Sequence, residues 1–447
     1  MYLTDRTAPA GAGTDRGRRR GPRPGVAPVV LVLGTVSLIT DISSEMVTAV
    51  LPLYLVTTLG FSPLAFGTLD GVYNGVSALV QLTGGHLADR IRNHKLLAGL
   101  GYGLSALCKP LLLLVSSIGA LGTVLALDRT GKGLRTAPRD AMISLSTPSG
   151  KQGRAFGVHR AMDTTGAMLG PLAAFLILSA AADGYDAVFG VSACVAVLGV
   201  VVLVLFVPGR RRAARADRAS EAEGRQPGVV REAGEADTGV PEAGAADGKP
   251  PVRIREAFAL LRLPRLRALA GCAALLGLTT VSDAFVYLLL QRRAGIGEQW
   301  FTLLPLGTAL VFLLLAVPLG ALADRVGRHT VFLSGHGALL TGYALLLWAP
   351  ATPALPFLVL ALHGVFYAAT DGVLPAALAD IVPEELRASG LAIVGTSQAL
   401  ARFCCSLAFG AAWTVWGDGP ALAASAVGLL CCAAVAGRVL RPADGNR

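Results

Sequence analysis

Long apolar runs recur from one end of this chain to the other. Each has roughly 20 residues, and an α-helix of that length crosses the hydrocarbon core of a lipid bilayer, which is about 30 Å thick. Hydrophobic residues make up 53% of the chain and charged residues 15%, whereas about a quarter of the residues in a soluble domain are charged. The pattern therefore predicts an all-α polytopic membrane protein embedded in a lipid bilayer.

We expect about twelve membrane-spanning helices, because each run is long enough to cross the bilayer once. Their approximate bounds are 29–57, 63–84, 96–116, 119–140, 155–181, 186–207, 267–291, 299–319, 330–349, 355–380, 389–412 and 419–438. A linker rich in Ala, Gly, Glu and Arg separates the sixth run from the seventh, and such a composition is typical of a disordered segment. The expected organisation is a basic tail (1–27), a six-helix bundle (28–208), a linker with an amphipathic segment (209–265), a second six-helix bundle (266–440) and a short tail (441–447).

The net charge of +10 invites a nucleic-acid interpretation, but the positions of the basic residues favour a membrane topology. If the first tail is cytoplasmic, most Lys and Arg residues of the short loops also fall on the cytoplasmic side, as the positive-inside rule requires. Arg292 and Arg293 are exceptions. We therefore expect a multi-pass protein of the plasma (cytoplasmic, inner) membrane, with both termini cytoplasmic and with no nucleic-acid partner.

The cysteines and histidines show no spacing typical of a metal site. No nucleophile–base motif or phosphate-binding loop is present in the sequence either. The sequence therefore predicts that the protein is not an enzyme and that it uses no metal and no cofactor.

Two similar segments mark an internal duplication. GGHLADRIRNHK (84–95) follows the second run, and LGALADRVGRHT (319–330) follows the eighth. The matched residues include Gly85 with Gly320, Asp89 with Asp324, and Arg90 with Arg325. Many secondary transporters are built from such paired halves, with the substrate site between them.

Over nearly its whole length the chain resembles the major facilitator superfamily, whose signature after the second helix is G-x-L-A-D-R-x-G-R-[RK]. The second copy fits this signature closely, whereas the first has Arg92, Asn93 and His94 in place of its last residues. The resemblance implies twelve transmembrane helices in two six-helix pseudo-repeats. It also implies that the two segments gate the conformational change, with Asp89 meeting a helix N-terminus of the other half. The alternative is a pair of tight turns whose charges only set the topology.

The predicted fourth span carries a stripe of charges. Asp128, Lys132, Arg135 and Arg139 follow one another at helical spacing, so they share one side of the helix, as in a span that faces an interior cavity. Asp128 stands four residues before Lys132, the favourable order for an ion pair. For Arg135 and Arg139 the alternative is that they reach the membrane surface.

Proton-linked members of the superfamily carry R-x-x-Q-G in this helix. Arg129 and Gly133 match that motif, and Lys132 replaces the glutamine. The resemblance implies a role for Arg129 in proton transfer. The additional cation at Lys132 favours a substrate with negative charge.

The predicted fifth span resembles the signature of efflux antiporters, G-x8-G-x3-G-P-x2-G-G. Gly157, Gly166, Gly170 and Pro171 match it, and Ala174 and Phe175 replace the last glycines. The resemblance implies a part in the conformational change of an antiporter. Close helix packing and a proline kink are the alternative explanation.

Acidic residues recur inside the predicted spans: Asp41 and Glu45 in the first, Asp283 in the seventh and Asp371 in the tenth. A carboxylate in a low dielectric binds a proton more readily unless a cation compensates its charge. In the family, the first, fourth, seventh and tenth helices line the cavity, so these acids are candidate proton carriers. The alternative is a static network in which Asp41 or Glu45 is bridged to Arg129 or Lys132.

Together these patterns predict a monomeric, proton-coupled transporter that exports a small amphipathic or anionic organic compound by alternating access. Proton-symport uptake of an organic acid or a sugar-like solute is the alternative. The expected substrate and proton pathway comprises Asp41, Glu45, Asp128, Arg129, Lys132, Arg135, Asp283 and Asp371.

Overall fold

A computed structural model describes residues 27–90, 94–147, 152–181, 184–207, 262–371, 373–379, 381–382 and 387–440. The regular structure in these ranges is entirely helical, which confirms the all-α prediction. The first half contains α1 (Pro28–Leu53), η1 (Tyr54–Thr58), α2 (Pro63–Arg90), α3 (His94–Leu111), α4 (Ile118–Leu145), α5 (Gln152–Ala180) and α6 (Gly184–Phe206). The second half contains α9 (Pro264–Gly277), α10 (Asp283–Ala294), α11 (Glu298–Phe301), α12 (Leu304–Val326), α13 (Arg328–Trp348), α14 (Leu355–Thr370), α15 (Val373–Ala379), α16 (Arg387–Trp416) and α17 (Asp418–Val439). Both tails and nearly all of the predicted linker, including most of its amphipathic segment, lie outside the described residues.

Within the described residues, 7 helical stretches are long and apolar enough to cross a membrane. They are Pro28–Thr58, Arg154–Ala180, Gly184–Phe206, Glu298–Val326, Arg328–Trp348, Ile393–Trp416 and Asp418–Val439. The predicted second, third and fourth spans are also helices, α2, α3 and α4. The count of twelve spans stays a prediction.

The predicted seventh and tenth spans are each divided into two helices, which corrects the expectation of single helices over 267–291 and 355–380. α9 ends at Gly277, and α10 begins at Asp283. The hydroxyls of Thr279 and Thr280 donate to the carbonyl of Leu276, and such local bonds compete with helix continuation. The freed amide of Val281 donates to the Tyr343 hydroxyl at 2.8 Å, which satisfies the backbone inside the protein, as a break at membrane depth requires.

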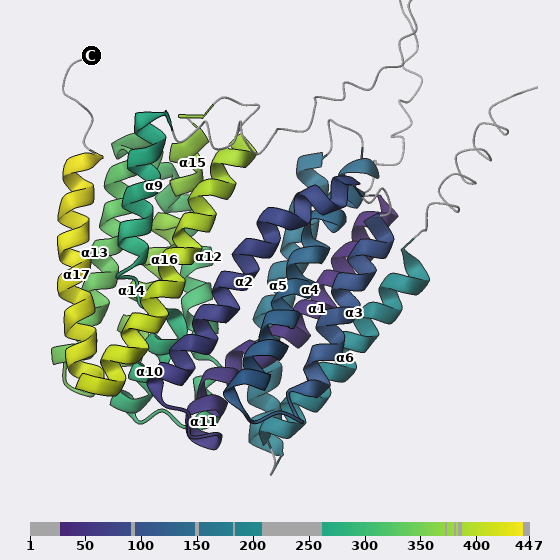
Figure 1. Cartoon of the computed structure of the whole chain (residues 1–447), viewed down its shortest axis with the longest axis horizontal. Helices are drawn as coiled ribbons and strands as arrows, with labels where there is room; N and C mark the ends of the chain where they lie inside the picture. The colour runs from purple at the N-terminus through teal and green to yellow at the C-terminus, as the bar shows by residue number, and fades with distance from the viewer. Residues whose placement is uncertain are drawn as a thin grey trace, which may run out of the picture.

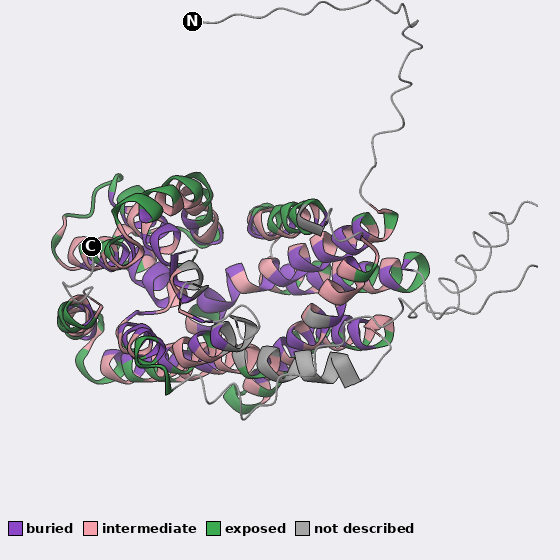
Figure 2. Cartoon of the chain, turned by 90° about the horizontal axis from the view of Figure 1, so that it is seen from above, coloured by how far each residue is buried: buried purple, intermediate pink, exposed green. Residues whose placement is uncertain are grey.

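The two halves lie side by side (Figure 1). In the first half, α1 packs against α5 and α6, and α4 packs against α2 and α3. In the second half, α14 packs against α12 and α13, and α16 packs against α9 and α17. Large apolar side chains such as Leu314, Val317 and Phe357 are exposed, and the exposed residues gather on the outer sides of the helices (Figure 2). Such an apolar exterior suits contact with lipid chains.

The two ends of the molecule are named as follows. The linker end is the end at which α1 and α9 begin and α6 and α17 end, and the far end is the opposite one (Figure 1). The halves meet through α2 and α16 and through α5 and α11. Leu64 donates its amide to Thr414 at 3.0 Å, and Tyr185 donates to Glu298 at 3.0 Å. These contacts lie at the far end, and the ribbons of the two halves diverge toward the linker end.

Candidate functional site

A cavity lies between the two halves. Its lining comes from α1 and α2 of the first half and from α10, α12, α14 and α16 of the second. It has a volume of about 360 Å³ and is therefore large enough for a small organic molecule. Its charged lining residues are Glu45, Asp70, Asp283, Asp371 and Arg402.

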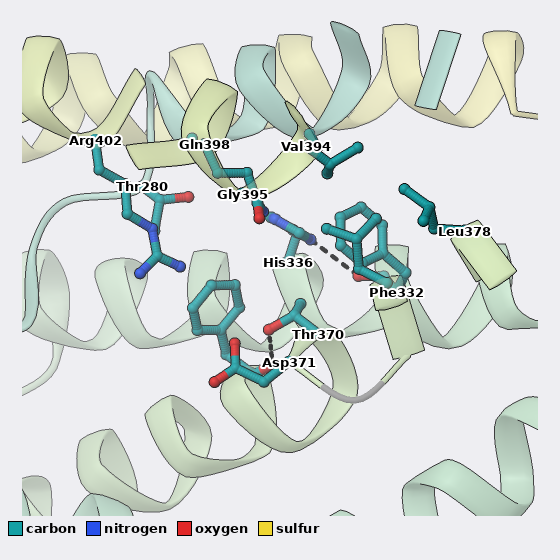
Figure 3. A pocket seen from close by; sticks show the side chains of 14 residues that line it. Thr280, Phe332, His336, Thr370, Asp371, Leu378, Val394, Gly395, Gln398 and Arg402 are labelled. Atoms are coloured by element: carbon teal, nitrogen blue, oxygen red, sulfur yellow. Dashed lines mark hydrogen bonds between the residues drawn. The ribbon is translucent and has the colours of Figure 1, made fainter. Parts of the chain in front are cut away.

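A second, smaller pocket of about 120 Å³ lies inside the second half, between α9, α13, α14, α15 and α16 (Figure 3). Thr280, Asp371 and Arg402 line both the cavity and this pocket, so the two spaces adjoin at these residues. The pocket wall is mainly apolar and aromatic, with a few polar groups. Its side chains include Phe332, His336, Phe366, Thr370, Leu374, Leu378, Val394 and Gln398.

Asp283 is the first residue of α10, directly after the break. Its carboxylate is 3.0 Å from Nε2 of His363 and accepts a hydrogen bond of 2.6 Å from the hydroxyl of Tyr367. His363 and Tyr367 are four residues apart on α14, so they lie on the same face of that helix. The side chain of Asp283 is still 43% exposed. The structure therefore places this predicted proton carrier at the cavity wall, between two side chains that can exchange protons with it.

Asp371 follows directly after α14, at the second break, and is exposed to the cavity. Arg402 comes from α16 and lines the same two spaces. Neither side chain forms an ion pair with any described residue, although their charges are near enough to interact.

Arg402 was not predicted, because the pathway expected from the sequence contains no basic residue of the second half. Its position near the middle of a predicted span was the available signal, because an ionisable residue inside a membrane is usually functional. The second half therefore also holds a cation, supplied by α16 rather than by the tenth span.

Asp128 lies in a buried cluster between α3 and α4. Its carboxylate pairs with Lys109 at 3.0 Å and with Arg129 at 2.7 Å, and accepts a hydrogen bond from Ser105 at 2.6 Å. The three charged side chains are only 3–5% exposed. The expected pairing of Asp128 with Lys132 is therefore wrong, and Lys109 was not predicted. The reason is the close packing of α3 on α4, which brings Lys109 to Asp128.

Arg129 is separated from the cavity by an aromatic ring. Its guanidinium lies 3.9 Å from the ring centre of Tyr73, and Tyr73 lines the cavity whereas Arg129 does not. The Tyr73 hydroxyl bonds to that of Thr48 at 2.9 Å. In this conformation Arg129 and Asp128 are placed to hold α3, α4 and Tyr73 together, not to touch a solute.

The other cations of α4 also face carboxylates. Lys132 lies 3.7 Å from Glu45, at partly exposed positions, and Glu45 lines the cavity. Arg135 lies 3.3 Å from Asp41 and is buried, so the interpretation that it reaches the membrane surface is wrong. Of the ion pairs considered from the sequence, Glu45 with Lys132 is present, whereas Asp41 takes Arg135 as its partner.

Arg139 is also drawn inward. It contacts Asp140 at 3.1 Å and Asp163 at 3.5 Å, and it donates to Ser37 at 3.2 Å.

The glycines of α5 serve close packing on α1. A Cβ at Gly166 would lie 2.5 Å from the carbonyl oxygen of Leu38, and one at Gly170 would lie 2.9 Å from that of Ile42. Gly157 has open space around it, and Pro171 lies within α5. The matched glycines at 166 and 170 therefore lie at the α1–α5 contact, and their part in a conformational change stays a prediction.

Of the two predicted gating segments, only the second has all its side chains described. The surroundings of Gly85 and the side chains of Asp89 and Arg90 lie outside the part that the structure describes. In the second copy Arg328 pairs with Asp324 at 3.4 Å on an exposed turn, and Gly327 has φ 100°, where glycine is favoured. Gly320 has open space around it, and Arg325 is exposed.

Proteins of an archaeon and of mycobacteria are similar to this chain in sequence. A chain described as an uncharacterized MFS-type transporter of Methanocaldococcus jannaschii is 28% identical over 397 residues, which covers 86% of this chain and 88% of that protein. An uncharacterized protein of Mycobacterium bovis is 31% identical over 162 residues, or 36% of this chain and 39% of that protein.

Solved structures share the fold at low sequence identity. The nucleoside transporter NupG is 14% identical with a TM-score of 0.73, covering 93% of this chain and all (100%) of that one. A peptide transporter POT variant in complex with sulfate is 16% identical with a TM-score of 0.65, covering 92% and 94%. At these identities the likeness establishes the fold and no substrate.

The sequence pattern of the Major Facilitator Superfamily matches residues 33–404 and, in a second match, 295–446. These matches cover most of the chain, and the helical architecture and the cavity between two halves agree with them. The chain therefore belongs to the Major Facilitator Superfamily, a family of membrane transporters and not of enzymes.

Proposed function

We propose that this protein is a proton-coupled secondary transporter that moves a small amphipathic or anionic organic compound through the central cavity. The observation that carries the proposal is the cavity itself, which both halves line and which holds Glu45, Asp70, Asp283, Asp371 and Arg402. Ionisable side chains are expensive inside a membrane and mark substrate or proton pathways. The broken helices α9–α10 and α14–α15 end at this cavity, as the discontinuous helices of many transporters do at their substrate sites.

Alternating access follows from where the halves touch. The inter-half contacts of α2 with α16 and of α5 with α11 lie at the far end, so we assign this conformation as closed at the far end and open toward the linker end. In the opposite conformation those contacts open and the gating segments with Asp89 and Asp324 close. We propose a monomer in the plasma membrane with the linker end and both termini cytoplasmic.

The acidic residues of the predicted pathway form two groups, those that line the cavity and those that are buried in ion pairs. Glu45, Asp283 and Asp371 line the cavity, and we assign proton binding to them. Asp41 and Asp128 are held in buried ion pairs with Arg135, Lys109 and Arg129, so we assign them a structural role.

Efflux and uptake remain the two candidate directions. The fifth-span motif that suggests efflux is explained at Gly166 and Gly170 by helix packing. The cation Arg402 beside Asp371 favours the second candidate, in which an organic anion and a proton travel together.

We expect Asp283→Asn to abolish proton-driven accumulation. Asparagine cannot take up a proton, so proton binding can no longer strengthen solute binding. Coupling free energies between two binding sites are typically about 1–3 kcal/mol, which corresponds to a change in affinity of about 5–150-fold. The measurement is solute accumulation in proteoliposomes under an imposed pH gradient, with a solute that the wild type accumulates. Asp186→Asn, an exposed acid at the start of α6, is the matched control and should accumulate normally. Accumulation by Asp283→Asn at the wild-type level would contradict the assignment.

A further inference from the structure

We propose that Arg402 binds the acidic group of an amphipathic organic acid, that the second-half pocket takes the apolar body of that compound, and that Asp371 binds the proton that travels with it. This inference rests on the proposed transport function and deepens it by naming the substrate class and the sense of coupling. Neither residue role was expected from the motifs of the fourth and fifth spans.

The first observation is that Arg402 makes no close ion pair, although Asp283 and Asp371 lie near enough for their charges to act on it. In the first half, Lys109, Arg129, Lys132, Arg135 and Arg139 each lie within ion-pair distance of a carboxylate. Arg402 has no such partner in the part of the chain that the structure describes. An unpaired charge is costly at membrane depth. An arginine that stays unpaired there and lines a cavity is placed to receive a carboxylate or phosphate from a ligand, which its planar fork of donors can bind in bidentate fashion.

The second observation is the shape of the space next to Arg402. Its guanidinium stands at one side of the pocket of about 120 Å³, Phe332 stands at the other, and His336 lies between them (Figure 3). Leu374, Leu378 and Val394 complete an apolar wall. A polar group at one edge of an apolar recess is the usual arrangement of a small-molecule site. A compound with an acidic group at Arg402 therefore has room for a ring or short chain in this recess.

The third observation concerns coupling. Asp371 lines the same two spaces as Arg402, so a charged Asp371 repels an anion at Arg402 and a protonated Asp371 does not. By linkage, each of the two ligands strengthens the binding of the other. A proton and an organic anion that load together in this way are transported in the same direction, which is symport.

Other titratable groups surround this couple, but most are engaged elsewhere. His363 and Tyr367 on α14 bond to Asp283 on α10. His336 on α13 bonds through Nδ1 to the carbonyl of Phe332, and Asp70 on α2 accepts from Ser406. Glu45 on α1 faces Lys132, and Cys405 on α16 is buried. Asp283 and Asp371 are the carboxylates whose charges act on Arg402, and of these two only Asp371 has no side-chain hydrogen bond or ion pair with a described residue.

The test is ligand-induced thermal stabilisation of the purified full chain at constant ionic strength. The probes are sulfate and a matched set of 3-phenylpropanoate, its neutral amide and the corresponding amine. The variants are Arg402→Gln, Arg402→Lys and Asp371→Asn, with Arg438→Gln on the exposed face of α17 as the control for loss of one arginine. Because Arg402 forms no ion pair with a described residue, Arg402→Gln should have an unfolding temperature no lower than that of the wild type in the absence of anions. Arg402→Lys, which keeps the positive charge, is a second variant for the anion measurements.

The expected result is that sulfate and 3-phenylpropanoate stabilise the wild type and Arg438→Gln, whereas the amide and the amine do not. Loss of a charge-assisted hydrogen bond should raise the apparent Kd about 10–100-fold in Arg402→Gln. Sulfate should bind the wild type more tightly as the pH falls, and Asp371→Asn should bind it tightly at every pH.

Equal anion binding by Arg402→Gln and wild type, no anion response at all, or preference for the amine would overturn the inference. The proposed transport function would survive those outcomes if an uncharged or cationic solute were accumulated in an Asp283-dependent manner. If no solute of any charge were accumulated, the proposed function would fail with it.

Discussion

Asp128→Asn is expected to destabilise the protein by about 3–5 kcal/mol, the usual effect of removing one partner from a buried ion pair. The substitution keeps the size of the side chain and leaves Lys109 and Arg129 as two buried cations without a counter-charge. Total stabilities of about 5–15 kcal/mol make this a severe loss. The free energy of unfolding in mixed detergent micelles measures it.

Two further proteins separate a structural role from a transport role. Asp186→Asn changes an exposed acid and should alter stability by less than about 0.5 kcal/mol. The double variant Lys109→Met with Asp128→Asn removes one charge of each sign and should recover part of the loss. If instead Asp128→Asn is as stable as the wild type but inactive, Asp128 acts directly in transport, in keeping with its place in the expected substrate and proton pathway.

Gly410→Val is expected to shift the protein away from the conformation closed at the far end. A Cβ at Gly410 would lie 2.5 Å from the carbonyl oxygen of Pro63 on the opposing half, and a backbone atom cannot move aside as a side chain can. Overpacking costs about 1–3 kcal/mol, which changes the ratio of two conformations by about 5–150-fold. Distances between spin labels at Thr58 and Asp418, both exposed at the far end, should lengthen.

Gly190→Val provides the comparison, because a Cβ at Gly190 meets no atom within 4 Å. This control should leave the distance distribution as in the wild type. An unchanged distribution in Gly410→Val would mean that the contact of α2 with α16 is not part of the conformational change.

The apolar runs were sufficient to predict the helices, because a segment that crosses lipid must satisfy its own backbone and can do so as a helix. They were insufficient to predict the breaks at 278–282 and after Thr370, because both segments are apolar enough to read as continuous. The break before Asp283 depends on Tyr343 of α13, which is distant in sequence and satisfies the freed amide of Val281.

The charged residues show a similar division. The stripe on α4 was visible from helical spacing, and it correctly indicated an interior face. The ion-pair partners could not be predicted, because they come from different helices. Lys109 of α3 reaches Asp128 of α4 only through the packing of these two helices, and Asp41 of α1 pairs with Arg135 of α4. The pathway acids named from the sequence stay a prediction, and which of them line the cavity depends on tertiary packing.

The central claim is that one cavity opens alternately to the two sides of the membrane, and side-specific labelling of Ala309→Cys tests it most directly. Ala309 is an exposed residue of the cavity wall on α12, and the 7 native cysteines would first be replaced. A membrane-impermeant maleimide is applied to sealed vesicles of either orientation, with and without a proton gradient. We expect labelling from both sides, faster from the linker side, with a ratio that changes when the gradient is imposed. Labelling from one side only, under every gradient, would contradict it.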